Sequence, residues 1–149
     1  MEKYILNLAG EYRVCAEILK RGIFATVTMG NLKAADIHII VNKHVYSVEV
    51  KTTNGKRFVT SFFQKYKAPE LDHPDFWILC HLDTLRDRFF ILTHEELARV
   101  QSNRNSHSKV FDWLEEANRS AKGVDNVLID DIEIYENQWD NIESLLIKD

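Results

Sequence analysis

Two short segments with alternating apolar and polar residues constrain the fold of this chain more than any other feature. Residues 36–41 and 45–51 flank a polar stretch, 42–44, a pattern typical of two antiparallel strands joined by a tight turn. If Val41 pairs with Tyr46, one face of the strand pair is entirely apolar, as a buried sheet face requires. That face comprises Ile37, Ile39, Val41, Tyr46, Val48 and Val50. We therefore expect the chain to build a sheet around this pair.

The rest of the pattern alternates between helical and strand periodicity. Helices are expected over residues 3–21, 58–67 and 109–122. A further helix is expected to start after the Thr93–Glu96 capping box. A final helix is expected at the apolar stripe formed by Tyr135, Trp139, Ile142 and Leu146. The other expected strands cover 23–29, 76–82, 88–92 and 127–129. With no internal repeat and no linker, residues 1–149 are predicted to form one domain.

The polar face of the central strand pair carries two carboxylates and a lysine. In the predicted register Asp36 lies opposite Lys51, and His38 lies opposite Glu49. Asp36 and Glu49 are then diagonal neighbours about 7–8 Å apart at the backbone, close enough to share a divalent cation. A lysine beside them can orient or activate a water molecule and offset charge on a phosphate oxygen. The set suits phosphodiester hydrolysis, although an exposed strand face with an ionic cluster explains the same spacing.

Glu11 lies within the apolar stripe of the first predicted helix. At 100° per residue it falls between Leu8 and Cys15. A carboxylate on such a stripe is costly unless it is paired, hydrogen-bonded or metal-bound. Glu11 is therefore either the partner of a buried base or a third acid directed at the metal site, and we favour the second interpretation.

These residues, in this order, resemble the PD-(D/E)XK nuclease superfamily, and the similarity is closest to small prokaryotic members and resolvase-like folds. The matching positions are Gly10-Glu11, Gly22, Ala35-Asp36, Glu49-Val50-Lys51, and Gln64 and Tyr66 on the following helix. The resemblance covers residues 1–95 and implies a restriction-endonuclease-like fold of the α/β (α+β) class. Such a fold has an αβββαβ core whose central mixed sheet is flanked by helices, so residues 96–149 would form a helical C-terminal extension.

The resemblance also implies roles for single residues. Asp36 and Glu49, with the carbonyl of Val50, would hold a catalytic Mg²⁺ or Mn²⁺. Lys51 would support the nucleophilic water, and Glu11 would match the acid that many members carry on the first helix. Ala35 stands where the family has proline, which removes no ligand. The expected function is that of a metal-dependent endonuclease acting on DNA. The alternative is a catalytically inactive relative that binds nucleic acid or another protein.

A base-rich stretch adjoins these residues. Between Lys51 and Lys67 there are five bases and no acid, so this stretch could attract phosphates or simply form a solvated face. The candidate nucleic-acid-binding residues are Lys56, Arg57, Gln64, Lys65 and Lys67. The aromatic residues interleaved with them are expected to be mostly core. The formal charge of −4 does not exclude a polyanion partner, because residues 115–149 hold −7 and the rest of the chain holds +3.

Further features bear on location and partners. Cys15 and Cys80 are far apart, no apolar run approaches the ~18 residues of a membrane span, and the start lacks a signal-peptide pattern. A cytoplasmic protein is therefore expected. His38 is expected to be an ordinary strand histidine, with a contact to metal or substrate as the alternative. The acidic C-terminal region could complete the core, cover the sheet, pair in a homodimer or dock on a protein partner.

Overall fold

The structure is a computed structural model, and it describes residues 1–29, 35–66, 72–105 and 125–147. Its helices are α1 (Lys3–Lys20), α2 (Phe62–Tyr66), α3 (His94–Arg104) and α5 (Asp140–Glu143), with 3-10 turns at Ile129–Asp131, Glu133–Tyr135 and Ser144–Ile147. Its strands are β1 (Ala25–Val27), β2 (Ile37–Val41), β3 (His44–Thr53), β4 (Arg57–Val59), β5 (Phe76–His81), β6 (Arg88–Thr93) and β7 (Asn126–Leu128). The predicted helix over 109–122 lies outside the described residues.

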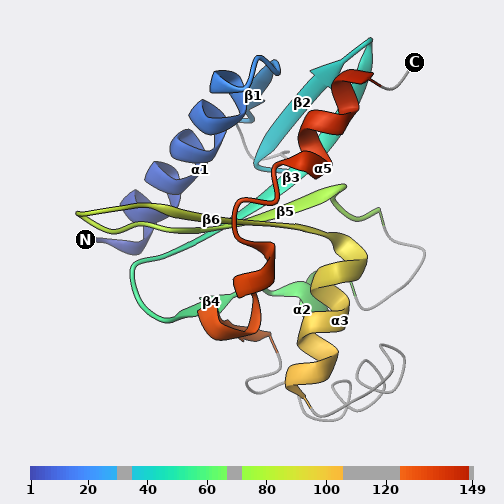
Figure 1. Cartoon of the computed structure of the whole chain (residues 1–149). Coiled ribbons are helices and arrows are strands. Elements are labelled where there is room, and N and C mark those ends of the chain that lie inside the picture. The colour runs from blue at the N-terminus through green and yellow to red at the C-terminus, as the bar shows by residue number, and fades with distance from the viewer. Residues whose placement is uncertain (30–34, 67–71, 106–124, 148–149) are drawn as a thin grey trace.

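A five-stranded sheet in the order β1-β2-β3-β5-β6 forms the centre of the molecule. The neighbours are antiparallel except for β3 and β5, which run parallel. The mixed α/β class is confirmed, with a mixed sheet flanked by helices (Figure 1). The separate pair β4–β7 lies on one side of this sheet.

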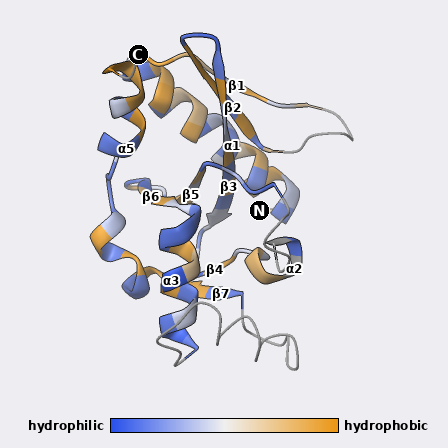
Figure 2. Ribbon diagram, turned by 90° about the vertical axis from the view of Figure 1, so that its right-hand side faces the viewer, coloured by the Kyte–Doolittle hydropathy of each residue, from blue (hydrophilic) through white to orange (hydrophobic). Residues whose placement is uncertain are grey.

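The central sheet separates two hydrophobic cores (Figure 2). One core lies under α1 and α5 and includes Ile78, and the other lies under α2, α3 and the β4–β7 pair and includes Trp77. Successive residues of a strand point to opposite faces, so β5 contributes to both cores and is apolar along almost its whole length.

Helix α1 buries one face on the sheet and ends as predicted beside Gly22, whose φ is +78°. Gly10 sets how closely the helix approaches, because a Cβ at that position would lie 1.8 Å from the Thr52 side-chain oxygen on β3. The helix backbone therefore rests directly on β3, and this contact fixes the position of the next residue, Glu11. No helix in the described part of the chain has the length and apolar character needed to cross a membrane.

The β2–β3 hairpin differs from the prediction in register but not in face. The observed pairs are Ile37–Val48, Ile39–Tyr46 and Val41–His44, so the predicted pairing of Val41 with Tyr46 is wrong by two residues. The cause is a two-residue turn in which Asn42 and Lys43 both have positive φ, +50° and +67°. A shift of two residues keeps every side chain on its face, and the predicted apolar face does lie in the core under α1.

The predicted helix over 58–67 is wrong in its first part. Phe58 belongs to β4 and pairs with Val127 of β7, and α2 begins only at Phe62, after Ser61 with φ of +56°. The predicted strand over 127–129 is confirmed within one residue as β7. Pairing between segments so far apart along the chain overrides the local helical pattern of residues 58–61.

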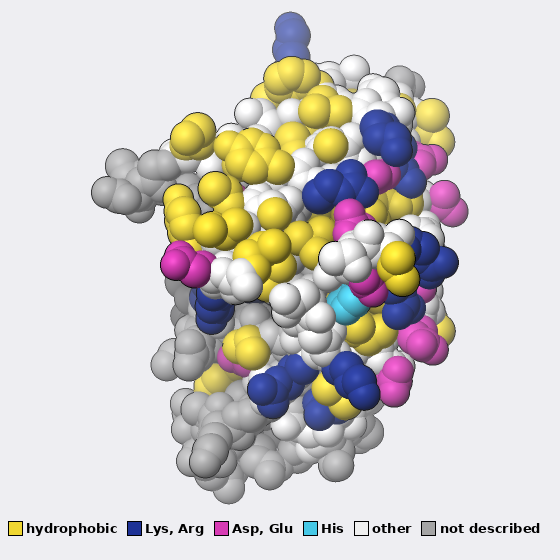
Figure 3. Space-filling view, turned by 90° about the vertical axis from the view of Figure 1, so that its left-hand side faces the viewer, with side chains coloured by type: hydrophobic (Ala, Val, Ile, Leu, Met, Phe, Trp, Pro, Cys, Tyr) yellow, Lys and Arg dark blue, Asp and Glu magenta, His cyan; other side chains and the backbone are white. Residues whose placement is uncertain are grey.

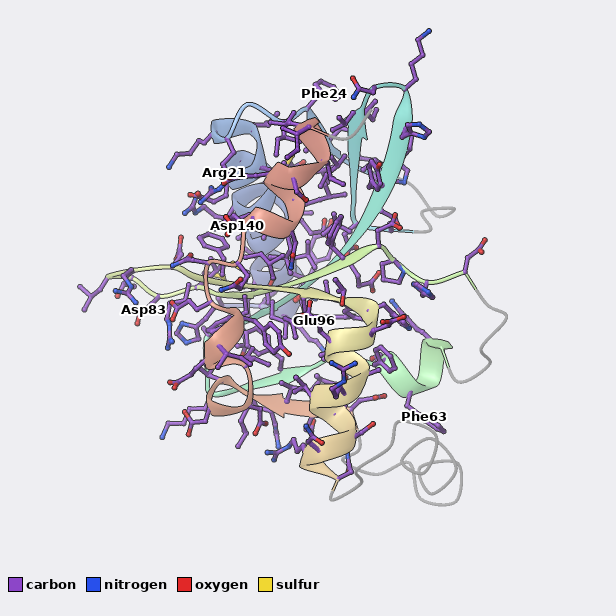
Figure 4. The ribbon with its side chains drawn as sticks, turned by 45° about the vertical axis from the view of Figure 1, so that its right-hand side comes forward. Arg21, Phe24, Phe63, Asp83, Glu96 and Asp140 are labelled. Atoms are coloured by element: carbon purple, nitrogen blue, oxygen red, sulfur yellow. The ribbon has the colours of Figure 1, made fainter. Side chains whose placement is uncertain are left out.

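The predicted C-terminal helix is interrupted in the structure. Glu136 forms an isolated bridge with Phe90, and Asn137 has φ of +59°, so only the short α5 and flanking 3-10 turns follow. Trp139 and Ile142 are buried in the core with α1, so this region completes the core. Figure 4 shows Arg21, just beyond α1, close to the start of α5 at Asp140.

Candidate functional site

The candidate site lies where β2 separates from β3. The ladder between these strands ends at the pair Ile37–Val48, whereas β3 continues to Thr53 beside β5. Asp36 occupies this junction. Its N–H donates to the carbonyl of Val48 at 3.0 Å, and its carboxylate accepts from the N–H of Val50 at 2.8 Å. The carboxylate thus takes the place of a strand acceptor and is held beside Glu49 and Lys51.

Glu49 is buried, and the ammonium groups of two lysines approach its carboxylate. The Lys65 Nζ lies 2.5 Å and the Lys51 Nζ lies 3.5 Å from the same oxygen, Oε1. Burial, and after it the positive charge of Lys65, lowers the pKa of Lys51, while Glu49 and Asp36 oppose that shift. A lysine with a lowered pKa exchanges its proton more readily than an ordinary lysine. Such a lysine can therefore take part in proton transfer with a water molecule.

Glu11 lies on the face of α1 that lines a groove beside β1. Its side chain is 8% exposed and lines this groove with Val27 and Thr28, at and just beyond the end of β1. The N–H of Thr28 donates to the carbonyl of Asp36 at 2.9 Å, and its hydroxyl contacts the carbonyls of Ala35 and Asp36. One wall of the groove is therefore bonded to the backbone that carries Asp36. The link from Glu11 to the start of β2 therefore runs through Thr28, which lines the groove with Glu11 and is bonded to the backbone of Asp36.

The remaining predicted residues are distributed more widely. Lys56 and Arg57 are exposed at the start of β4, on the two-stranded sheet. Gln64 belongs to α2, but its side chain is not among the described parts of the structure. Lys67 lies outside the described residues. Val50 donates its N–H to Asp36, while its side chain lies in the core.

Two predicted cross-strand neighbours are corrected. His38 lies opposite Ser47 and not opposite Glu49, because the tight turn moves the register by two residues. For the same reason Asp36 does not lie opposite Lys51 and instead contacts the backbone of Val48 and Val50. Asp36 thus bonds to the backbone of the residues on both sides of Glu49.

Sequence reasoning missed an aromatic stack beside Glu49. Trp77 is the register partner of Glu49 on β5, and its indole N–H donates to His94 Nδ1 at 3.1 Å. The His94 ring stacks on Phe62 of α2 at 4.5 Å and on His73 at 4.0 Å between ring centroids. Burial and the neighbouring His73 lower the pKa of His94 to about 4, so the ring is neutral at pH 7. The stack holds α2, and with it Lys65, against the sheet.

The donor set suits a hard divalent cation. Among the described residues, no three His, Cys, Asp or Glu side chains gather into a ready metal-binding group. Mg²⁺ nevertheless binds through one or two carboxylates and completes its shell with waters and substrate phosphates. Asp36, just before β2, and Glu49, on β3, supply two such carboxylates, which is the chemistry that this cation prefers.

Comparison with known proteins gives a structural similarity but no sequence relative. No protein-family model matches the chain, and no curated protein matches it. Among solved structures, the chain is similar to a bacterial homing endonuclease with a TM-score of 0.46 and 14% identity, over 63% of this chain and 67% of that one. At this score and identity the likeness carries no functional argument, so function is argued from the residues of the site.

Proposed function

We propose that this protein is a metal-dependent nuclease that hydrolyses phosphodiester bonds, with DNA as its substrate. One observation carries the proposal. Two buried carboxylates, Asp36 just before β2 and Glu49 on β3, lie at the open end of a hairpin, and two lysine ammonium groups lie within 3.5 Å of one of them. Buried charge is retained at a cost in stability, which favours a chemical role over a purely structural one.

Each residue has a distinct role in this proposal. Asp36, Glu49 and the Val50 carbonyl would hold Mg²⁺ or Mn²⁺, which when bound supplies an acidified water and polarises the phosphate. Lys51, with its lowered pKa, would orient that water and stabilise charge on the phosphate. Glu11 would act from α1 on the same junction, as a further acceptor for a water molecule or an outer partner of the metal.

Lys65 connects the site with its substrate. Its ammonium neutralises Glu49 at 2.5 Å, but about half of its side chain is exposed, with a relative accessibility of 47%. The same ammonium can therefore turn outward to a phosphate oxygen when Glu49 is otherwise engaged. Lys56 and Arg57, exposed on the neighbouring small sheet, would extend the basic surface for the nucleic-acid backbone.

A second candidate function is a nucleic-acid-binding module without catalysis. The observation that favours it is the direct contact between Lys65 and Glu49, which neutralises the carboxylate without a metal ion. A homodimer and a protein partner at the acidic C-terminal region stay predictions.

Cleavage assays separate the two candidates. The full chain is incubated with duplex, single-stranded and branched DNA and with RNA, in Mg²⁺, in Mn²⁺ and in chelator. We expect metal-dependent cleavage that falls by at least about 100-fold in Asp36→Asn and in Lys51→Met, since each removes a group that acts on the developing charge. Arg88→Met, far from the site on β6, is the control and should cleave like the wild type.

Two outcomes contradict the nuclease proposal. One is cleavage that persists in chelator or in both site variants. The other is binding of nucleic acid, unaffected by chelator, with no cleavage of any substrate, which supports the binding module instead.

A further inference from the structure

We propose that the groove between α1 and β1 binds an unpaired nucleobase next to the bond that is cleaved, so that the preferred substrate is single-stranded. This inference rests on the proposed nuclease function and names its substrate class. The α1–β1 groove has a volume of about 310 Å³ and is lined, among others, by Tyr4, Asn7, Glu11, Tyr12, Thr28 and Met29. A space of this size with aromatic walls and few polar groups is typical of a small-molecule or base pocket.

The groove offers aromatic surface that the core does not use. Tyr4 is 72% exposed and Tyr12 is 54% exposed. With Leu8 they follow one another at intervals of four residues, which places them along one stripe of α1. Met29, 83% exposed, lies beyond β1 and completes the apolar wall. The side of the molecule that carries α1 shows a broad group of hydrophobic side chains (Figure 3). Aromatic side chains in such positions stack on bases with little regard to sequence.

The groove is also lined by polar groups. The Asn7 amide, the Thr28 hydroxyl and the Glu11 carboxylate all line it. An amide donates and accepts, and a carboxylate accepts from exocyclic amino groups, so these side chains can bond the edge of a base. A purely apolar occupant would make no hydrogen bond to the Asn7 amide or to the other polar side chains of the lining. This chemistry favours a nucleobase over the apolar face of a second copy of the chain.

The distribution of charge suggests separate sites for the base and for the phosphate of a nucleotide. Of the described residues that line the groove, only Glu11 is charged, so the groove suits the neutral base and not the phosphate. The ammonium groups of Lys51 and Lys65 lie at the Glu49 carboxylate and suit the phosphate. The hydrogen bonds from Thr28 to the Asp36 carbonyl attach one wall of the groove to the backbone that carries Asp36, whose carboxylate accepts from the Val50 N–H, next to Glu49 in the chain. A base in a duplex would have to leave its stack to occupy the groove, whereas a single strand would not.

Binding of a fluorescent oligonucleotide tests this inference. The probe is a single-stranded oligodeoxynucleotide that contains 2-aminopurine, titrated in Ca²⁺ and in chelator with the full chain. The double variant Tyr4→Ala/Tyr12→Ala should bind it roughly ten-fold more weakly, as the loss of one base–aromatic stack implies. Binding of a fully paired duplex of the same sequence should change by less than about two-fold, since stacking on an unpaired base is not involved.

Matched variants separate stacking from other effects. Tyr4→Phe/Tyr12→Phe keeps the rings and should bind like the wild type. Phe24→Ala removes an aromatic side chain that is also exposed, near the start of β1, but does not line the groove, and should have no effect. Tyr12→Gln serves as a single polar replacement if the double variant fails to fold. An equal loss for duplex and single strand would overturn the inference, and so would a wild-type dimer that the tyrosine substitutions convert to a monomer.

The inference and the proposed function can fail separately. If chelator-sensitive cleavage depends on Asp36 and Lys51 but single-strand binding ignores the tyrosines, the groove assignment is wrong and the nuclease stands. If no substrate is ever cleaved but single-strand binding depends on the tyrosine rings, the groove assignment stands and the nuclease fails.

Discussion

Two ionic clusters of this molecule differ in the kind of cation they contain. The lysine cluster consists of Asp36, Glu49, Lys51 and Lys65 at the junction of β2 and β3. The arginine cluster joins α1 to β6, the turn before it and the C-terminal region. Its main residues are Arg13, Glu17, Arg21, Asp87, Arg88 and Glu136, and the more exposed Lys20, Arg86 and Glu143 pair with them at its edge.

In the arginine cluster each partner stabilises the charge of the other. The Nε and Nη2 atoms of Arg88 donate to the two carboxylate oxygens of Glu136 at 3.0 and 2.8 Å. This pairing raises the pKa of Arg88 and lowers the pKa of Glu136. The Nε of Arg13 donates to Asp87 at 2.8 Å, and this bond raises the pKa of Arg13. Bidentate and directed bonds of this kind hold a geometry.

The lysine cluster behaves in the opposite way. Burial and the neighbouring ammonium of Lys65 lower the pKa of Lys51 despite two nearby carboxylates. An ammonium is a compact charge on a flexible stem, without the planar fork that ties an arginine to one carboxylate. The comparison teaches that the arginine cluster is held by directed, bidentate pairing, whereas the lysine cluster lacks such pairing, as the proposed turning of Lys65 from Glu49 to a phosphate requires.

The largest expected difference concerns metal binding. If the proposed site is correct, Glu49→Gln should weaken Mn²⁺ binding by more than about 100-fold, because even an outer partner of a metal ligand is worth about 10- to 100-fold. Glu136→Gln is the same substitution at a carboxylate of the arginine cluster and should leave Mn²⁺ affinity unchanged. Calorimetric titration without nucleic acid measures both. Equal effects of the two substitutions would abolish the distinction between the clusters.

A substitution in α1 should disturb both clusters at once. In Gly10→Ala the new Cβ would lie 1.8 Å from the Thr52 hydroxyl oxygen, so the helix must move away from β3. Overpacking of this kind costs about 1–3 kcal/mol, and we expect a value near the upper end in the free energy of unfolding by urea. Gly55→Ala is the matched control, because its Cβ would meet Thr53 at an ordinary 3.7 Å. A Gly10→Ala protein as stable as Gly55→Ala would show that the helix does not rest on β3.

The smallest expected effect is the pH dependence of the arginine cluster. Because its pKa is lowered in the folded protein, Glu136 contributes stability above its ordinary pKa of 4.5, and that contribution is lost as pH falls through the folded value. Glu136→Gln should therefore lower the free energy of unfolding by about 1 kcal/mol at pH 7. The difference from the wild type should shrink as pH falls below 4.5. Glu133→Gln, on an exposed residue nearby, should change stability by less than about 0.5 kcal/mol at either pH. A pH-independent difference for Glu136→Gln would contradict the role of the ion pair.

The elements set by local signals could be predicted from the sequence. The periodicity of α1 and the alternation of β2 and β3 identified their buried faces. The capping box at the start of α3 is present as predicted, with Thr93 accepting from the Glu96 N–H at 3.1 Å and Glu96 accepting from the Thr93 N–H at 2.9 Å. In each case the signal and the structure that it specifies lie within a few residues of one another.

Features that depend on distant contacts could not be predicted. The hairpin turn uses Lys43 at positive φ, where glycine would have been the usual signal, so the register was predicted two residues out. Strand β4 exists because Phe58 pairs with Val127, which no local pattern records. The contact of Lys65 with Glu49 likewise depends on where the aromatic stack places α2. The residue types of the site were thus readable in the sequence, but their mutual contacts were not.

The bond from Val50 to the Asp36 carboxylate has a practical consequence for experiments on this protein. That carboxylate satisfies a backbone donor at the point where β3 loses its neighbouring strand. Replacing Asp36 with alanine would leave this buried donor without an acceptor, which costs about 1–3 kcal/mol. Asparagine keeps an acceptor oxygen at the same place. Alanine variants of this position are therefore expected to lose stability as well as chemistry, and the asparagine variant is the better basis for trapping complexes at the concentrations that crystallisation requires.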